Sequence, residues 1–557
     1  VRRGGRSEAG DQPPRYLAPS THEPIYKATD NVTNSQKKKK SITFLDQSLA
    51  ATLIARSVRL HPSPQPISKA GHTTMTGATL RPDQADLPSA KSTASYWHRE
   101  PSTTLLGHRT TKALPPTADV VVVGSGITGA FATKELLEQQ AVKGKKKVLL
   151  LEAREVCWGA TGRNGGHCQP VAYNPNTAIA DFELRNYAHL AHFIAANAVP
   201  CDWVSLRGVH ALLTPDLVAA AEKQIAALPP HLAGLARLVT DPEELKTLRV
   251  PNAAGAVVQE RAASVWPYKL VAWIFEDLLR RFGPGSGAET QSENGWFNIQ
   301  TNTPVTRLQH LPGSSGEASW VVHTDRGQVA AKKVLLASNA YTSRLLPSFA
   351  DLIVPVRGQV ATLLPEPRAE LARSYVFMAS SDASKGEPNQ DDYLIQRPGP
   401  GLEMILGGGR ARGTLRGVGV SDDDEVDPVV AAYLRRAGAT NVDLGNEGEK
   451  EELTASYEWT GIMAFSRDGR PWVGPVPSGS VLGGGEGLWV CAGYTGHGMP
   501  QAALCGRAVA GMMVGSQGGG ENTVDVPADF VVSEERAEKA RALPSIKEMD
   551  DLDMFLL

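Results

Sequence analysis

A glycine-rich turn between two structured segments is the first part of the sequence that could perform chemistry. Val120–Val123 is a short β-branched run, typical of a strand buried on both faces of a parallel sheet. Gly124, Gly126 and Gly129 follow with GxGxxG spacing, and residues 130–140 have the composition of a helix. Gly124 permits a tight turn, Gly126 lets the backbone approach a pyrophosphate, and Gly129 lets the helix pack closely. The pattern predicts a dinucleotide-binding turn.

An acidic residue at the end of the next strand supports this prediction. Val148–Leu151 is a second buried run, and it ends at Glu152, 23 residues after Gly129. Strand, helix, strand and acid together indicate a βαβ unit, in which the N–H groups of Ile127 and Thr128 face the phosphates. We expect Glu152 to accept hydrogen bonds from a ribose diol. A free 2′-hydroxyl implies a ligand of the FAD or NAD type and not NADP.

The segment that follows Glu152 favours the longer of these ligands. A nicotinamide-binding unit would normally return soon to a third strand. Residues 153–168 are instead extended and glycine-rich, with hydroxyl, amide and guanidinium groups suited to lie along a long dinucleotide. The cofactor-binding candidates of this arm are Ala153, Arg154, Gly159, Ala160, Thr161, Arg163, Asn164, Gly165 and Gly166.

With this arm, the sequence resembles the D-amino-acid oxidase/glycine oxidase superfamily of FAD-dependent oxidoreductases, and within it the γ-glutamylputrescine oxidase-like branch. Further stretches are similar to the family in the expected order: residues 264–270, which open a helix towards Phe282, then 302–307, 328–341, 355–359 and the second glycine-rich turn in 488–499. The resemblance covers about residues 95–515. It implies further FAD contacts at Val305, Ala337, Asn339, Gly493, Gly496, His497, Gly498 and Met499.

The resemblance also implies the chemistry. We expect oxidation of a C–N bond by hydride transfer to flavin N5, with oxygen as the acceptor and hydrogen peroxide as a product. The expected partners are a small-molecule amine and oxygen. No cysteine stands in residues 459–470, where one branch places a covalent flavin linkage, so non-covalent FAD is expected. His497 lies in the second glycine-rich turn and is a candidate for contact with the cofactor and for proton transfer.

One departure from the family bears on the substrate. Met463 stands where amino-acid-oxidising relatives carry an arginine that pairs with the substrate carboxylate. A thioether cannot neutralise a buried carboxylate, so a free α-amino acid is disfavoured unless Arg357 or Arg410 supplies the clamp. Tyr393, Arg410 and Trp459 are candidates for the substrate pocket, although they are equally consistent with ordinary strand residues of the sheet.

The order of segments predicts the architecture. We expect an α/β fold: a Rossmann-type FAD-binding domain with an inserted α+β substrate domain built on a mainly antiparallel sheet. The expected FAD domain comprises residues 115–204, 258–350 and 455–515, and the substrate domain 205–257 and 351–454. Residues 1–114 are expected to be a disordered or extended tail and lead-in, and residues 516–557 a linker and a charged surface helix over 533–543.

Composition limits the other classes of function. Hydrophobic residues make up 41% of the 557, enough for a large core. The net charge of −2 provides no global field for nucleic acid or an anionic membrane. It combines about +7 in residues 1–74, including Lys37–Lys40, with about −9 in the remainder. This N-terminal part is interpreted as an unstructured extension or as sequence upstream of the true start, with a basic import or nucleic-acid patch as the alternative.

The cysteines and the apolar runs point to an intracellular location. The five cysteines form neither a disulfide framework nor a metal-binding spacing, so no metal site is expected. No apolar run reaches the roughly 18 residues needed to span a bilayer. Residues 48–60 resemble a transit helix but lie far inside the chain. We expect a cytoplasmic protein.

Three other functions stay open. A flavin monooxygenase would share the GxGxxG turn but usually has a late Gly-Asp pair, where this chain has Gly493-Tyr494. A nicotinamide dehydrogenase is disfavoured by the arm after Glu152. A non-catalytic flavin-bound interaction protein would share all the cofactor motifs, with Lys37–Lys40 as a contact element.

Overall fold

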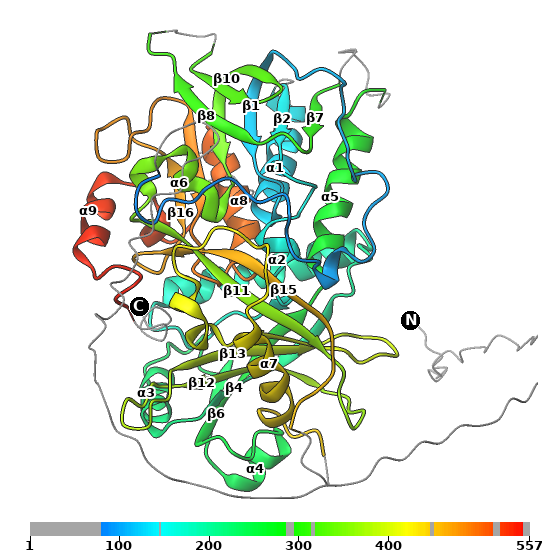
Figure 1. Ribbon diagram of the computed structural model, residues 1–557. Coiled ribbons are helices and arrows are strands. Elements are labelled where there is room, and N and C mark those ends of the chain that lie inside the picture. The colour runs from blue at the N-terminus through cyan, green and yellow to red at the C-terminus, as the bar shows by residue number, and fades with distance from the viewer. Residues whose placement is uncertain are drawn as a thin grey trace, which may run out of the picture. The chain divides into compact units, whose positions relative to one another are not determined.

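The computed structural model describes residues 80–143, 146–285, 295–313, 318–445, 451–515 and 524–549, all within the compact unit Lys69–Leu557. The predictions for the basic N-terminal part, for residues 48–60 and for most of the glycine-rich linker lie outside the described residues. Within them, two sheets account for most of the strands (Figure 1).

The first sheet has a parallel centre in the order β17-β10-β1-β2-β7. β2 and β7 are buried throughout, as expected for parallel strands covered on both faces, and β1 and β10 are buried in their carboxyl-terminal parts. β16 pairs antiparallel with β17 at one edge, and β8 and β9 extend β10 as an antiparallel meander. The bounds are β1 Thr117–Val123, β2 Val148–Leu151, β7 Phe297–Gln300, β8 Val305–His310, β9 Trp320–Thr324, β10 Gly327–Leu336, β16 Trp472–Pro475 and β17 Leu488–Ala492.

Three helices pack together beside this sheet. α1 (Ile127–Lys143) follows the GxGxxG turn and packs against α8 (Ala502–Met513) and α5 (Pro267–Phe282). α5 confirms the helix expected from residues 264–282, with Pro267 in its first turn, where its missing N–H is not needed. α2 (Thr177–Ala196) packs on α8.

The second sheet runs β15-β11-β14-β13-β12-β4-β6-β3, with β5 paired to β6. Among its described pairs, β12 with β4 is parallel and the others are antiparallel. The bounds are β3 His167–Cys168, β4 Val204–Leu212, β5 Ala236–Val239, β6 Gly255–Ser264, β11 Ile353–Leu363, β12 Arg373–Ala379, β13 Gln390–Gln396, β14 Met404–Gly408 and β15 Ala455–Ser466. Three helices lie beside this sheet (Figure 1): α3 (Pro215–Ala226), α4 (Pro242–Thr247) and α7 (Pro428–Thr440).

The predicted fold class is confirmed, while the expected domain bounds need two changes. β15 pairs with β11 almost throughout its length, so residues 455–466 belong to the second sheet. β6 continues in the second sheet to Ser264, beyond the expected bound at 258. Continuous strand pairing fixes both changes, and the division into an FAD domain and a substrate domain remains a proposal.

The described part of the expected tail and lead-in, residues 80–114, is mostly chain without regular secondary structure, with one 3-10 turn at Tyr96–His98. Tyr96 and Trp97 are buried, at 3% and 0% exposed. They pack against Trp266 and belong to the main hydrophobic core. The segment is therefore part of the folded body.

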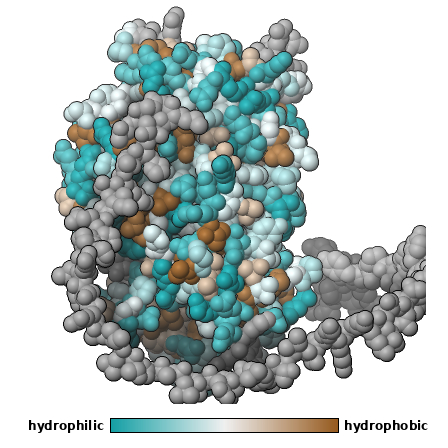
Figure 2. Space-filling model, in the orientation of Figure 1, coloured by the Kyte–Doolittle hydropathy of each residue, from teal (hydrophilic) through white to brown (hydrophobic). Residues whose placement is uncertain are grey.

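The surface and the C-terminal helix agree with the sequence. α9 (Glu534–Ala542) begins after Ser533, whose hydroxyl accepts a hydrogen bond from the Arg536 N–H. In the view of Figure 2, hydrophobic residues are scattered among hydrophilic ones. Among the described residues, no helix is long and apolar enough to cross a bilayer.

Candidate functional site

A cavity of about 390 Å³ lies where the carboxyl ends of β1, β2 and β10 meet β11, β13 and β15 of the second sheet. The carboxyl ends of parallel strands are where open α/β sheets bind their ligands. Of the residues singled out from the sequence, those that line it are Gly124, Gly126, Ile127, Thr128, Glu152, Ala153, Arg154, Gly159, Ala160, Thr161, Arg163, Asn164, Gly165, Val305, Ala337, Asn339, Tyr393, Arg410, Met463, Gly496, His497, Gly498 and Met499.

The GxGxxG turn forms a close-fitting cradle at one end of this cavity. Gly124 has φ +106°, and a Cβ there would lie 2.6 Å from the Ala337 carbonyl oxygen. A Cβ on Gly129 would lie 2.1 Å from the Gly124 carbonyl oxygen, so the helix can start this close only with glycine. A Cβ on Gly126 would lie in the cavity, 3.0 Å from Thr161 Oγ1. The missing side chains therefore leave backbone open to a ligand.

The carboxylate of Glu152 is fixed in place beside this cradle. Its Oε2 accepts hydrogen bonds from the Ser125 N–H (3.0 Å) and from Ser125 Oγ (2.6 Å). Its Oε1 accepts a bond from the Arg154 N–H at 2.9 Å. A carboxylate oxygen can accept further bonds, so this arrangement is compatible with the ribose diol expected here.

The arm after Glu152 is held by a buried ion cluster that sequence reasoning missed. Asp423 Oδ1 lies 2.9 Å from Arg154 Nη1, and Asp423 Oδ2 lies 3.0 Å from Arg163 Nε. The Asp423 and Arg163 side chains are fully buried, and burial lowers the pKa of Arg163 to about 10. Asp423 stands in an acidic run, residues 421–427, and the local sequence gives no signal of its burial.

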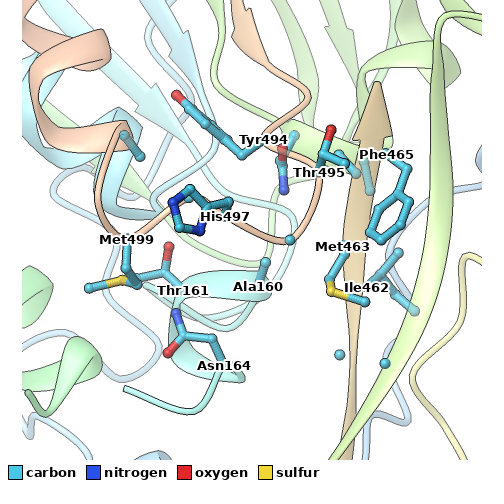
Figure 3. A pocket seen from close by; sticks show the side chains of 18 of the residues that line it. Ala160, Thr161, Asn164, Ile462, Met463, Phe465, Tyr494, Thr495, His497 and Met499 are labelled. Atoms are coloured by element: carbon cyan, nitrogen blue, oxygen red, sulfur yellow. The ribbon is translucent and has the colours of Figure 1, made fainter. Parts of the chain in front are cut away.

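His497 reaches the cavity from the second glycine-rich turn (Figure 3). Its Nε2 lies 3.1 Å from Oε2 of Glu183 in α2. Glu183 Oε2 also accepts a hydrogen bond from the Val171 N–H, and Glu183 Oε1 accepts one from Gln501 Nε2. Burial lowers the pKa of His497, but the charge and hydrogen bond of Glu183 outweigh it, and the net pKa is raised. Sequence reasoning found His497 and missed Glu183.

The second glycine-rich turn precedes its helix by several residues. Thr495 and Gly496 have φ +49° and +76°, and the His497 N–H donates to the Tyr494 carbonyl oxygen. α8 begins only at Ala502. Residues 494–499 of the turn therefore face the cavity, and so does Ala502 at the start of α8.

The far end of the cavity brings together Tyr393, Arg410, Asp391 and Met463. Arg410 is 5% exposed; its Nη2 lies 3.2 Å from Asp391 Oδ2, and its guanidinium lies 4.7 Å from the centre of the Phe465 ring. Tyr393 packs so tightly that a Cβ on Gly165 would lie 2.1 Å from its ring. Met463 belongs to β15, whereas His497 belongs to the second glycine-rich turn (Figure 3).

Two histidines lie beside this end, His210 on β4 and His167 on β3. His210 on β4 contacts the Tyr173 hydroxyl (2.8 Å) and the Gln169 amide (2.9 Å). His167 lies 6.1 Å from the Tyr393 ring, centre to centre, and its buried Nε2 has no protein hydrogen-bond partner. Burial, with a contribution from His497, lowers the pKa of each histidine to about 3. Both are therefore neutral around pH 7.

Five residues named from the sequence do not line the cavity. Arg357 forms ion pairs with Asp422 (3.2 Å) and Glu425 (3.1 Å). Trp459 is fully buried, and its indole N–H donates to the Arg163 carbonyl oxygen. The other three are Gly129, Gly166 and Gly493, which shape the turns behind the cavity wall.

The five cysteines are buried and free. Burial raises the pKa of Cys157 and of Cys168, which keeps these thiols protonated. Within the described ranges, no group of three or more His, Cys, Asp or Glu side chains is arranged to hold a metal ion.

Curated relatives match most of the chain. The γ-glutamylputrescine oxidoreductase of Escherichia coli is 25% identical over 426 residues, which cover 72% of this chain and 84% of the relative. The glycine oxidase of Pseudomonas aeruginosa is 26% identical over 411 residues, which cover 72% and 95%. The crystal structure of glycine oxidase from Geobacillus kaustophilus shares the fold, with a TM-score of 0.56, 19% identity and coverage of 75% of this chain and 98% of that one.

The geometry fits the cofactor that the sequence predicts. The glycine cradle leaves backbone open for a pyrophosphate, Glu152 suits a ribose, and the cavity continues past the arm to a second, polar end. Residues 119–512 match the family described as FAD dependent oxidoreductase. The match spans well over half of the sequence, and the chain therefore belongs to this family of FAD-dependent oxidoreductases.

Proposed function

We propose that this protein oxidises a C–N bond of a small amine or amino-acid derivative, with oxygen as the electron acceptor and hydrogen peroxide as a product. The observation that carries the proposal is the single cavity that joins the dinucleotide cradle to a polar end lined by Tyr393, Arg410 and His497. The names of the relatives in Escherichia coli and Pseudomonas aeruginosa, a γ-glutamylputrescine oxidoreductase and a glycine oxidase, support the substrate class.

FAD, when bound, accepts the hydride that leaves the substrate carbon; the protein supplies position and electrostatics. The GxGxxG cradle and Glu152 would hold the adenosine and phosphate half. Thr161 and Asn164 of the arm, with the turn at Gly496, would line the part of the cavity that leads to the polar end. We propose that the substrate binds between the arm and β13.

Arg410 is the best-placed group for a substrate carboxylate. It lines the polar end, whereas Arg357 forms its ion pairs outside the cavity. A charge-assisted hydrogen bond of this kind contributes about 1.5–3 kcal/mol. Met463 lines the same space without charge, so the carboxylate would bind towards β14 and away from β15. An amine whose carboxylate is remote from the reacting carbon suits this layout.

His497 and Glu183 are proposed to hold a proton at the cavity wall. The carboxylate favours the protonated imidazole, which places a positive charge beside the cavity. Tyr393 is proposed to orient the substrate, because its ring is held between Gly165 and Gly407 and burial raises the pKa of its hydroxyl, which keeps that group a donor. We propose that the flavin is bound non-covalently.

The test is an amine panel on purified holoprotein. Peroxide release and anaerobic bleaching of the flavin absorbance are measured with γ-glutamyl amines, polyamines, sarcosine, glycine and D-amino acids. Bleaching with peroxide release for one of these classes supports the proposal. Flavin-loaded protein that none of them bleaches would favour a non-catalytic flavoprotein. Bleaching by a reduced nicotinamide dinucleotide would favour a monooxygenase or dehydrogenase.

A further inference from the structure

A segment that precedes the family-matched residues lies against the arm of the FAD site. We term residues 87–98 the strap; the arm is residues 153–168, as above. Leu87 and Pro88 of the strap line the cavity together with the arm. The family match begins only at residue 119. The strap therefore touches the site from outside the part of the chain that defines the family.

Hydrogen bonds from the strap satisfy the backbone of the arm. Ser95 Oγ donates to the Gly162 carbonyl oxygen at 2.8 Å, and Trp97 Nε1 donates to the Asn164 carbonyl oxygen at 2.5 Å. His98 Nε2 lies 3.2 Å from the Cys157 carbonyl oxygen. The arm has a single 3-10 turn and no strand pairing of its own before His167. These three carbonyl groups of the arm therefore have strap side chains as partners, since buried backbone groups need partners.

Thr93 connects the strap to the buried ion cluster. Its carbonyl oxygen and its hydroxyl accept bonds from Arg163 Nη2 at 2.5 and 2.7 Å. Its N–H donates to the Asp423 carbonyl oxygen at 2.8 Å. The same hydroxyl accepts a bond from the Thr460 N–H on β15. One strap residue thus joins the arm, the acidic loop and the second sheet.

Side-chain packing also holds the strap against the arm. The His98 ring stacks on Trp158 of the arm at 3.8 Å between centres and 3° between planes. A Cβ on Gly162 would lie 2.4 Å from His98 Nε2, so strap and arm are in close contact. Trp97 is fully buried and accepts a bond from the Trp266 indole at its carbonyl oxygen.

We infer that the strap is a functional wall of the FAD site: its side chains position the arm, and FAD affinity depends on them. The inference goes beyond the proposed reaction, because it concerns retention of the cofactor and is unaffected by which amine is oxidised. Ser95, Trp97 and Thr93 are positioning residues in this scheme, acting on FAD through the arm.

The test compares two tryptophans that each donate an indole N–H to a backbone carbonyl. Trp97→Phe removes the bond to Asn164, and the control Trp320→Phe removes an equivalent bond from Trp320 to the Glu486 carbonyl oxygen, away from the cavity. FAD affinity of the apoprotein is measured by quenching of flavin fluorescence, beside the melting temperature of the apoprotein. We expect Trp97→Phe to raise the Kd for FAD at least tenfold and Trp320→Phe to change it less than twofold.

A second pair keeps the inference testable if Trp97→Phe fails to fold. Ser95→Ala removes the hydroxyl that bonds Gly162, and the control Ser348→Ala removes a hydroxyl that bonds the Leu482 carbonyl oxygen. We expect weaker FAD binding, an altered visible circular dichroism of the flavin and faster hydrogen exchange in residues 157–166 for Ser95→Ala alone. A Kd within twofold of wild type for the strap variants, or an equal loss in strap and control variants, would overturn the inference.

Discussion

Asp423 Oδ2 lies 3.0 Å from Arg163 Nε, with neither side chain accessible to solvent. Arg154 approaches the same carboxylate from the other side, at 2.9 Å. One carboxylate of the second sheet's loop thus forms ion pairs with two guanidinium groups of the arm. An exposed pair would contribute little, but the removal of one partner from a buried cluster leaves an uncompensated charge.

We therefore predict that Asp423→Asn strongly destabilises the protein. The expected loss is about 3–5 kcal/mol in the free energy of unfolding, because both guanidinium groups stay buried without a counter-charge. Urea denaturation followed by tryptophan fluorescence measures it. Asp424→Asn, next in the chain but exposed, is the matched control and should stay close to wild type. Similar stabilities for the two variants would show that the cluster contributes little.

Gly126→Val is expected to abolish FAD binding. Its Cβ would lie in the cradle, 3.0 Å from Thr161 Oγ1, and the two methyl groups would occupy the space that backbone and phosphate share. The ratio of flavin to protein absorbance after purification reports the loss. Gly234→Val is the control, because Gly234 is exposed and its Cβ would meet no atom within 4 Å. Full cofactor occupancy in Gly126→Val would refute the role given to the turn.

Arg410→Gln is expected to weaken the binding of substrates that carry a carboxylate more than the binding of other amines. The loss of about 1.5–3 kcal/mol corresponds to a rise in KM of about 10- to 150-fold, with a smaller effect on amines that lack a carboxylate. Steady-state peroxide assays with matched substrate pairs measure it. Arg357→Gln, whose guanidinium pairs with Asp422 and Glu425 outside the cavity, serves as the control. A uniform rise for both kinds of amine would argue against Arg410 as the carboxylate ligand.

The pair His497 and Glu183 predicts a pH dependence of stability. Since the folded-state pKa of His497 is raised, its protonated pair stabilises the fold fully below the unfolded pKa of about 6.5. That contribution is lost as the pH rises through the raised value. We expect the gap in melting temperature between wild type and Glu183→Gln to be largest near pH 6 and to narrow at higher pH. For Glu222→Gln, an exposed change on α3, the difference in melting temperature from wild type should not vary with pH. A difference for Glu183→Gln that stays constant with pH would contradict the pairing.

The flavin should be released by acid. Cys157 and Cys168 are buried with raised thiol pKa values, so little thiolate forms to attack a flavin. After precipitation with trichloroacetic acid, the yellow colour should remain in the supernatant, with authentic FAD treated in parallel. Colour retained in the washed pellet would indicate a covalent link.

The parts of the fold that depend on residues close together in the sequence were predicted correctly. The βαβ unit and α5 depend on glycine spacing, apolar runs and a proline within one short segment, and they were predicted with correct order and type. The assignment of β15 failed because strand partners are decided by distant residues: β15 pairs with β11, about 100 positions earlier. Sequence alone could not say which sheet it joins.

The same reason explains the site residues that were missed. Glu183 meets His497 across 314 positions, and Asp423 meets Arg154 across 269. Asp423 stands in an acidic run, and Glu183 stands in the largely apolar helix α2, where nothing in the local sequence marks it as the partner of a histidine. Only the closure of the fold around them reveals that they are buried, and so sequence reasoning found one member of each pair.

The fixed carboxylate of Glu152 affects how tightly a dinucleotide can bind. Ser125 and the Arg154 N–H already hold that side chain in one rotamer. A ligand that meets a frozen acceptor loses no affinity to the ordering of that acceptor, a saving of about 0.5–1.5 kcal/mol for a side chain of this kind. Preorganisation of the ribose acceptor by a serine hydroxyl makes Ser125 a determinant of affinity although its Oγ is directed at Glu152.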